Sequence, residues 1–312
     1  MEGRQRFAID LPDQAAALAL AGEAEVNLKK ISESTGAQLV LRGLQLHIDG
    51  KPQQLEQAAA VVELLRHQWT AGETITAADL NTNLQALNKG HGSEQRLLSK
   101  QVLARSQSGK LLRPRTLGQR NYVEAMENHE LTLALGPAGT GKTFLAVVQA
   151  VRCLQERRVE RIVLTRPALE TAVEPYLRPL YDALHSLLSP ERTTALVEKG
   201  IIEAAPIAYM GGRTLADAFV IVDEAQNSSC AQMRMLLTRL GENSRMVVVG
   251  DPSQIDLPRG EPSGLVEAAQ VLDGVEGIAI CRLSAADVVR HPLVQGLVEA
   301  YAKQGGDPHG KN

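Results

Sequence analysis

Short apolar runs alternate with segments of helical periodicity from about residue 113 to near the end of the chain. The apolar runs predict strands at 131–135, 161–165, 219–222, 246–250 and 277–281. Apolar positions three and four residues apart predict helices at 118–128, 142–156, 175–189, 230–240, 263–272 and 292–303. Apolar strands alternating with helices are typical of a parallel sheet covered on both faces. The pattern therefore predicts an α/β domain over residues 115–303, followed by a polar tail at 304–312.

A different pattern fills residues 1–72. An alternating strand at 7–11 is followed by two helices on either side of Gly22, by two strands that turn at residues 42–43, and by a helix that ends near Trp69. This βααββα order predicts a small α+β module and resembles RNA-binding KH modules, in which a GXXG loop between the first two helices holds the nucleic-acid backbone. Here the loop reads Gly22-Glu23-Ala24-Glu25, so direct phosphate binding by it is not expected. A structural or oligomerising module is the alternative.

Residues 73–114 are expected to form a basic, helical linker between the module and the larger domain. Thr76 is a suitable N-cap for its first helix. A single acid, Glu94, accompanies the basic residues from 89 to 120, which are Lys89, Arg96, Lys100, Arg105, Lys110, Arg113, Arg115 and Arg120. Such a connector suits the phosphate backbone of a nucleic acid, although a solvated linker has the same composition.

The clearest chemical signal lies between the predicted strand at 131–135 and the predicted helix at 142–156. This strand, loop and helix context is that of a phosphate-binding loop, and it argues against a chance match. Glycines allow successive N–H groups to point toward the β-phosphate of a nucleotide. Lys142 would contact the β- and γ-phosphates, and the Thr143 hydroxyl would hold Mg²⁺. The residues expected to bind ATP are Gly136, Pro137, Ala138, Gly139, Thr140, Gly141, Lys142 and Thr143.

Two further predicted strands end in polar side chains. Asp223, which follows 219–222, is expected to hold Mg²⁺ through its water shell, and Glu224 to polarise an attacking water. This pair favours an ATPase over a phosphotransferase, the alternative being an acidic surface loop. Asp251 and Gln254 follow 246–250 and should lie near the γ-phosphate, because the carboxyl ends of parallel strands share one crevice.

Gln119 opens the helix that precedes the loop strand. An amide side chain donates and accepts hydrogen bonds together, as recognition of an adenine edge requires. Gln119 is therefore a candidate for binding the base of the nucleotide.

The composition is that of an ordinary soluble globular protein, with 44% hydrophobic and 22% charged residues and a net charge of −3. The net charge does not indicate a nucleic-acid partner, so that expectation depends on the local basic run. No apolar run reaches the roughly 18 residues that span a bilayer, and the N-terminal residues lack the apolar core of a signal peptide. We expect a cytoplasmic protein without membrane contact. Its cysteines, Cys153, Cys230 and Cys281, are expected to be reduced.

Many stretches of the chain resemble the PhoH-like ATPase family, the phosphate-starvation-inducible group. The similarity covers roughly residues 115–303, and the N-terminal module also resembles that of the family. Besides the phosphate-binding loop, the similar stretches are 164–168, 175–184, 208–210, 213–215, 223–227, 232–233, 237–241, 250–251, 254–258 and 287–294. The stretches 223–226 and 250–254 are similar to motifs of superfamily 1 helicases as well.

The resemblance implies a cytoplasmic ATP-binding protein linked to RNA metabolism, with ribonucleases or ribosome-maturation factors as partners. It also implies a ring, a hexamer. The chain departs from the family pattern at residues 171–174, where members have a longer loop. Gly211 and Ala216 stand where members have Arg and Asn, which puts RNA contact through that turn in question.

Together these observations predict a RecA-like P-loop domain that hydrolyses ATP with Mg²⁺. One alternative is an ATP-dependent RNA helicase or remodeller, and another is a nucleotide-switched scaffold that docks ribonucleases with little hydrolysis. The chain has room for one RecA-like domain, so an arginine that neutralises the γ-phosphate would come from a neighbouring subunit of a ring. Arg290 is the first candidate for this arginine, followed by Arg213 and Arg178.

Overall fold

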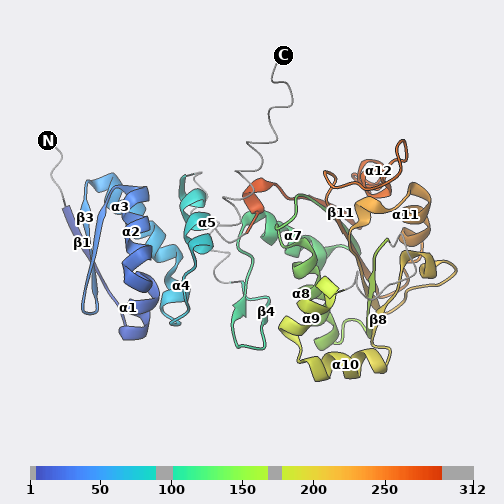
Figure 1. The fold of residues 1–312 in the computed structure, drawn as a ribbon, viewed down its shortest axis with the longest axis horizontal. Coiled ribbons are helices and arrows are strands. Elements are labelled where there is room, and N and C mark those ends of the chain that lie inside the picture. The colour runs from blue at the N-terminus through green and yellow to red at the C-terminus, as the bar shows by residue number, and fades with distance from the viewer. Residues whose placement is uncertain (1–4, 89–100, 168–177, 290–312) are drawn as a thin grey trace, which may run out of the picture. The chain divides into compact units, whose positions relative to one another are not determined.

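The computed structural model describes residues 5–88, 101–167 and 178–289, which divide into two compact units (Figure 1). One unit contains the N-terminal residues up to Gln101, and the other spans Val102–Val288. Each unit has hydrophobic clusters of its own, so each is described separately. Among the described helices, none is long and apolar enough to cross a membrane.

The first unit is an antiparallel sheet, in the order β1-β3-β2, packed against helices. Burial alternates along β3, so that Leu46 and Ile48 face a core that also contains Ile31 and Val62. The predicted order βααββα is confirmed. The elements are β1 (Gln5–Asp10), α1 (Gln14–Ala21), α2 (Val26–Thr35), β2 (Gln38–Arg42), β3 (Gln45–Gly50), α3 (Pro52–Leu64), α4 (Arg66–Trp69) and α5 (Ala77–Asn88).

The residues expected to form one helical linker are shared between the two units. Thr76 caps α5 as predicted, since its hydroxyl accepts a hydrogen bond from the N–H of Asp79 at 3.2 Å. Leu80 of this helix is buried in the core of the first unit. Residues 102–114 instead contain a two-stranded antiparallel hairpin, β4 (Ala104–Arg105) and β5 (Leu111–Leu112), where a helical connector was expected. Leu103 beside it is buried in the core of the second unit.

The second unit is built on a parallel sheet in the order β11-β6-β10-β9-β7-β8. The strands are β6 (Leu131–Leu135), β7 (Arg161–Thr165), β8 (Ile202–Ala204), β9 (Ala218–Val222), β10 (Arg245–Gly250) and β11 (Ile278–Arg282). The predicted α/β fold is confirmed, and the five predicted strands lie within a residue of their observed bounds. The edge strand β8 escaped prediction because three residues are too few to show a periodicity.

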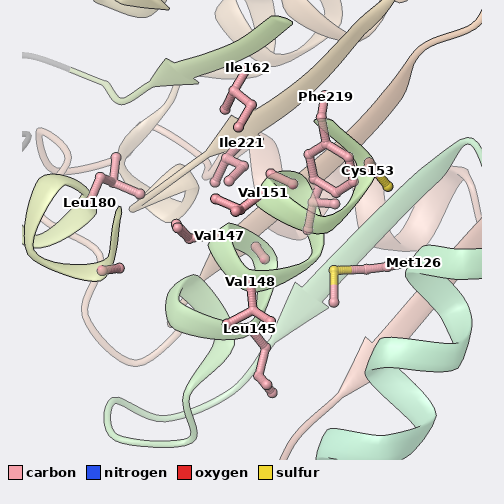
Figure 2. Close-up of a cluster of buried hydrophobic side chains, with 14 of the residues drawn as sticks. Met126, Leu145, Val147, Val148, Val151, Cys153, Ile162, Leu180, Phe219 and Ile221 are labelled. Carbon is pink, nitrogen blue, oxygen red and sulfur yellow. The ribbon is translucent and has the colours of Figure 1, made fainter. Parts of the chain in front are cut away.

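Helices cover both faces of this sheet, as Figure 1 shows. On one face, Val147 and Val151 of α8 pack with Phe219 and Ile221 of β9 and with Met126 of α7 (Figure 2). The other face packs against α11 and α12, in a separate cluster. The helices of this unit are α7 (Leu117–Asn128), α8 (Lys142–Gln155), α9 (Arg178–Leu187), α10 (Pro190–Glu198), α11 (Cys230–Leu237) and α12 (Gly264–Val271).

The strand positions could be predicted because the central strands are buried on both faces. The strands β6, β9 and most of β10 are buried along their length and are therefore continuous apolar runs in the sequence. The helix α10 was not predicted, since Thr193 is its one buried residue and it has no apolar stripe. The helix predicted at 292–303 and the tail at 304–312 lie outside the described residues.

Candidate functional site

The phosphate-binding loop connects β6 to α8 at the carboxyl end of the sheet. Gly139 and Gly141 adopt φ angles of 84° and 79°, in the left-handed region that favours glycine. A Cβ atom at Gly136 would stand 2.6 Å from the carbonyl oxygen of Leu283, so a larger residue would not fit there. The first N–H groups of an α-helix have no intrahelical partner, so the N-terminus of α8 is suitable for a phosphate.

Lys142 is buried at the base of this loop. Its Nζ donates hydrogen bonds to the carbonyl oxygens of Gly136 at 2.7 Å and Pro137 at 2.9 Å. Burial lowers the pKa of Lys142, against the opposing influence of the Asp251, Asp223 and Glu224 carboxylates. The ammonium is thus held beside the expected position of the β- and γ-phosphates by acceptors that a phosphate could replace.

The Thr143 hydroxyl donates a hydrogen bond of 2.7 Å to Oδ1 of Asp223, which follows β9. Burial raises the pKa of Asp223, and the Thr143 hydroxyl opposes this effect. A hydroxyl and a carboxylate oxygen side by side fit Mg²⁺, which uses one or two protein oxygens and fills its remaining positions with water and phosphate oxygens. These two residues, both predicted, would hold the ion.

Glu224 has a left-handed backbone with φ 52° and two differently bound carboxylate oxygens. Its Oε2 accepts a hydrogen bond of 2.5 Å from Nε2 of the buried Gln226. Its Oε1 lies 3.5 Å from Nη2 of Arg166, which follows β7. No role was expected for Gln226 or Arg166 from the sequence, although both belong to stretches that resemble the family.

Asp251 directly follows β10 and connects the end of this strand to the phosphate-binding loop. Its Oδ2 accepts hydrogen bonds from the N–H of Ala138 at 3.1 Å and from Nε2 of Gln254 at 2.8 Å. Burial acts to raise the pKa of Asp251, but hydrogen bonds from Ser253 and from the N–H of Ala138 outweigh it and lower the pKa. Gln226 binds this strand end too, because its Oε1 accepts from the N–H of Asp251 at 3.0 Å.

Gln119 is buried, and its amide binds the backbone of neighbouring segments. Its Oε1 accepts from the N–H of Arg115 at 2.8 Å, and its Nε2 donates to the carbonyl of Thr140 at 3.0 Å. The side chain therefore braces the phosphate-binding loop in this structure. Its helix is itself fixed by the Thr116 hydroxyl, which donates to the buried Asp287 carboxylate at 2.7 Å.

A cavity of about 290 Å³ collects these groups. Its lining includes Lys142, Thr143, Asp223, Glu224 and Gln254, so that most predicted site residues share one space. A larger hollow, of about 840 Å³, lies at the amino ends of the strands and is lined by three arginines and four carboxylates. No predicted site residue is among its lining residues, and a mixture of charges does not select one ligand.

Two of the three arginine candidates, Arg213 and Arg178, are described, and neither lines the 290 Å³ cavity. Both terminal nitrogens of Arg213 donate to the Glu203 carboxylate, at 2.6 and 2.8 Å, and this hydrogen bonding raises the pKa of the guanidinium. Arg178 is exposed at the start of α9. Arg290 and the short loop at 171–174 lie outside the described residues.

The parallel sheet, the glycine-rich loop and the Thr143–Asp223 pair define a P-loop NTPase. Residues 111–302 match the sequence profile of the family described as PhoH-like protein. The chain belongs to the PhoH family.

Similar proteins include a PhoH-like protein of Synechocystis sp., 47% identical over 95% of this chain and 94% of that protein. A PhoH-like protein of Bacillus subtilis is 43% identical over 94% of this chain and 95% of that protein, and Protein PhoH of Escherichia coli is 36% identical over 76% and 67%. Among solved structures, the Sulfolobus solfataricus SWI2/SNF2 ATPase core in complex with dsDNA matches with a TM-score of 0.34 and 13% identity, over 54% of this chain and 43% of that chain.

The raised pKa of Asp223 predicts a stability effect. The charged carboxylate is costly in the folded protein above its native pKa, and the cost disappears as the pH falls below the ordinary value of 3.8. Asp223→Asn should therefore raise the melting temperature of the nucleotide-free protein near neutral pH, by about 2–4 °C for each kcal/mol relieved, while weakening Mg²⁺-dependent nucleotide binding. Thermal unfolding at several pH values tests this.

The exposed Asp182→Asn on α9 is the matched control and should change neither property. At each pH the quantity of interest is the melting temperature of Asp223→Asn minus that of wild type. If this difference is smaller at neutral pH than at acid pH, the assignment of a buried, costly charge is contradicted.

Proposed function

We propose that the protein binds ATP with Mg²⁺ in this cavity and hydrolyses it in the cytoplasm. The observation that carries the proposal is the Thr143–Asp223 hydrogen bond across the loop, with Glu224 beside it in the same lining. Mg²⁺ would neutralise charge on the β- and γ-phosphates. A kinase that phosphorylates a small hydroxyl substrate needs no carboxylate to activate a water molecule. The presence of Glu224 therefore favours hydrolysis over phosphate transfer.

Each residue has a part that its position supports. The loop N–H groups and Lys142 bind the phosphates, and Thr143 and Asp223 orient the metal. Glu224, which is hydrogen-bonded to Gln226, would accept a proton from the attacking water. Gln254, which is hydrogen-bonded to Asp251, would contact the γ-phosphate. Gln119 holds the loop through the Thr140 carbonyl, and its amide is the candidate for contact with the base.

Replacing Lys142 and Glu224 separates binding from chemistry. Lys142→Ala should weaken nucleotide binding roughly ten- to hundredfold, because a charged donor to the phosphates is lost. Glu224→Gln should bind ATP with Mg²⁺ but turn it over about 10²–10⁴ times more slowly, because the amide cannot take the proton. Calorimetric binding and phosphate release measure the two effects. The exposed Glu261→Gln is the control; wild-type turnover by Glu224→Gln would place the base elsewhere.

We propose further that the activity serves RNA metabolism or ribosome maturation, with a ribonuclease or maturation factor as partner. The KH-like order of the first unit and the basic hairpin support an RNA partner. An RNA helicase or remodeller remains the alternative that the helicase-like stretches favour, and a scaffold with little hydrolysis is the other. The described residues contain one RecA-like sheet, which argues for action other than processive unwinding.

The basic hairpin offers a test of RNA binding. Arg105 and Lys110 are exposed on it, whereas Nε of Arg113 is buried, so the first two are the safer positions for charge reversal. Arg105→Glu with Lys110→Glu should weaken RNA binding and flatten the salt slope by about 1.4, because two phosphates lose their partners. Arg192→Glu on α10 with Lys199→Glu at its C-cap is the matched control, since both side chains are exposed. Equal affinities and slopes for both double variants would remove the hairpin from the RNA site.

We also propose a homo-oligomeric ring, a hexamer, in which a neighbouring subunit completes the site with Arg290. Inactive Lys142→Ala and Arg290→Ala subunits then lack different halves of a shared site. Mixing them should restore part of the hydrolysis. Exchange of subunits without any recovered activity would exclude sharing through Arg290.

A further inference from the structure

Arg166 occupies a junction between the candidate catalytic carboxylates and a surface turn. It follows β7, and the N–H of Asp223 donates to the carbonyl of the preceding residue, Thr165, at 2.9 Å. On the other side, the N–H of Ile207 donates to the carbonyl of Arg166 at 3.3 Å. Ile207 begins the short 3₁₀ helix η3 (Ile207–Met210), so one backbone segment contacts both the Asp223–Glu224 pair and this turn.

The two oxygens of Glu224 contact groups that differ in burial. Oε2 binds the amide of Gln226, which is fully buried and also bonded to Asp251 and to the carbonyl of Gln254. Oε1 faces Arg166, and the two side chains of this ion pair are 22% and 38% exposed. A partly exposed ion pair at 3.5 Å contributes little and exchanges easily for another partner. Loss of Arg166 would free Oε1 while Gln226 keeps the carboxylate in place.

The turn beside Arg166 carries an exposed aromatic ring. Tyr209 is 67% exposed in a chain with only 3% aromatic residues, whereas Tyr122 is buried in the core. Ala208 before it is also exposed, and so are Gly211 and Gly212, whereas Met210 between them is buried. The turn therefore joins an exposed aromatic ring to the backbone of an arginine. These are the two kinds of side chain that bind single-stranded nucleic acid, because the ring stacks on a base and the guanidinium binds a phosphate.

We propose that single-stranded RNA docks on this edge of the second unit and switches on hydrolysis by taking Arg166 away from Glu224. A base stacks on Tyr209, and a backbone phosphate takes the place of the Glu224 carboxylate beside Arg166. Oε1 of Glu224 then accepts a proton from the attacking water while the water oxygen forms a bond to the γ-phosphorus. The bond between the γ-phosphorus and the β–γ bridging oxygen breaks, and its electron pair stays on the oxygen of ADP. This inference rests on the proposed ATP hydrolysis, whose regulation it describes.

The first experiment measures ATP turnover of the full chain with and without a labelled oligouridine. Wild type should be stimulated by the RNA. Arg166→Gln should turn over faster than wild type without RNA, because Oε1 is free, and RNA should add little. Arg166→Lys keeps the charge and should retain part of the stimulation. Arg234→Gln on α11, an exposed arginine paired with Glu267, is the control and should behave as wild type.

The second experiment measures RNA affinity without nucleotide, by fluorescence anisotropy of the same oligouridine. Tyr209→Ala should weaken binding roughly tenfold, and Tyr209→Phe should restore it, since stacking needs the ring and not the hydroxyl. Gly211→Arg should tighten binding in a salt-dependent way. Gly211 has an ordinary φ of −60°, and the nearest atom to an added Cβ is the Ala208 carbonyl oxygen at 3.8 Å, so the side chain has space.

The two experiments distinguish failure of the switch from failure of the enzyme. A wild-type chain that hydrolyses no ATP would refute the proposed function, and the Tyr209 series would then still decide whether RNA docks here. If wild type is stimulated but Arg166→Gln slows the rates with and without RNA by the same factor, Arg166 only supports the fold or Glu224, and the switch is refuted. Unchanged RNA affinity of Tyr209→Ala, with loss of oligomers on gel filtration, would identify the ring as a subunit contact and overturn the docking surface.

Discussion

The parallel pairing of β6 with β10 and of β10 with β9 is the constraint on which the candidate site depends. Because these strands run in the same direction, the phosphate-binding loop, Asp251 and the Asp223–Glu224 pair emerge at one edge. Two hydrogen bonds then tie the strand ends together, from Thr143 to Asp223 and from the N–H of Ala138 to Asp251. The hydrophobic clusters on both faces of the sheet hold the strands in this register.

The charges at this edge are held at an electrostatic cost. Burial lowers the pKa of Lys142 and raises that of Asp223, so each charged form is less favourable there than in water. Phosphates beside Lys142 and a cation beside Asp223 would relieve both effects together. The binding of a metal-bound polyphosphate that we propose for this cavity is consistent with where the fold buries its charges.

The sequence was most informative where structure is local or burial is complete. The runs at 131–135 and 219–222 are apolar because both faces of each strand are covered. The loop at 136–143 is recognisable from the spacing of its glycines. The edge strand β8, the hairpin at 102–114 and α10 lack such a signal. Some contacts depend on how distant or bent segments meet in the fold, and the spacing of residues in the sequence does not predict them. They are the hydrogen bonds of Gln119 to Thr140 and of Gln226 to Glu224 and the ion pair of Arg166 with Glu224. The roles of Gln226 and Arg166 therefore needed the fold.

The most direct test of the account is a crystal structure of the protein with Mg²⁺ and a non-hydrolysable ATP analogue. The account predicts that Nζ of Lys142 leaves the Gly136 and Pro137 carbonyls, 2.7 and 2.9 Å away in the present structure, for the β- and γ-phosphate oxygens. It also predicts the metal between Thr143, Asp223 and the phosphates, with Glu224 facing the γ-phosphate. A nucleotide bound elsewhere, or one bound here with Lys142 still on those carbonyls and Asp223 remote from the metal, would contradict it.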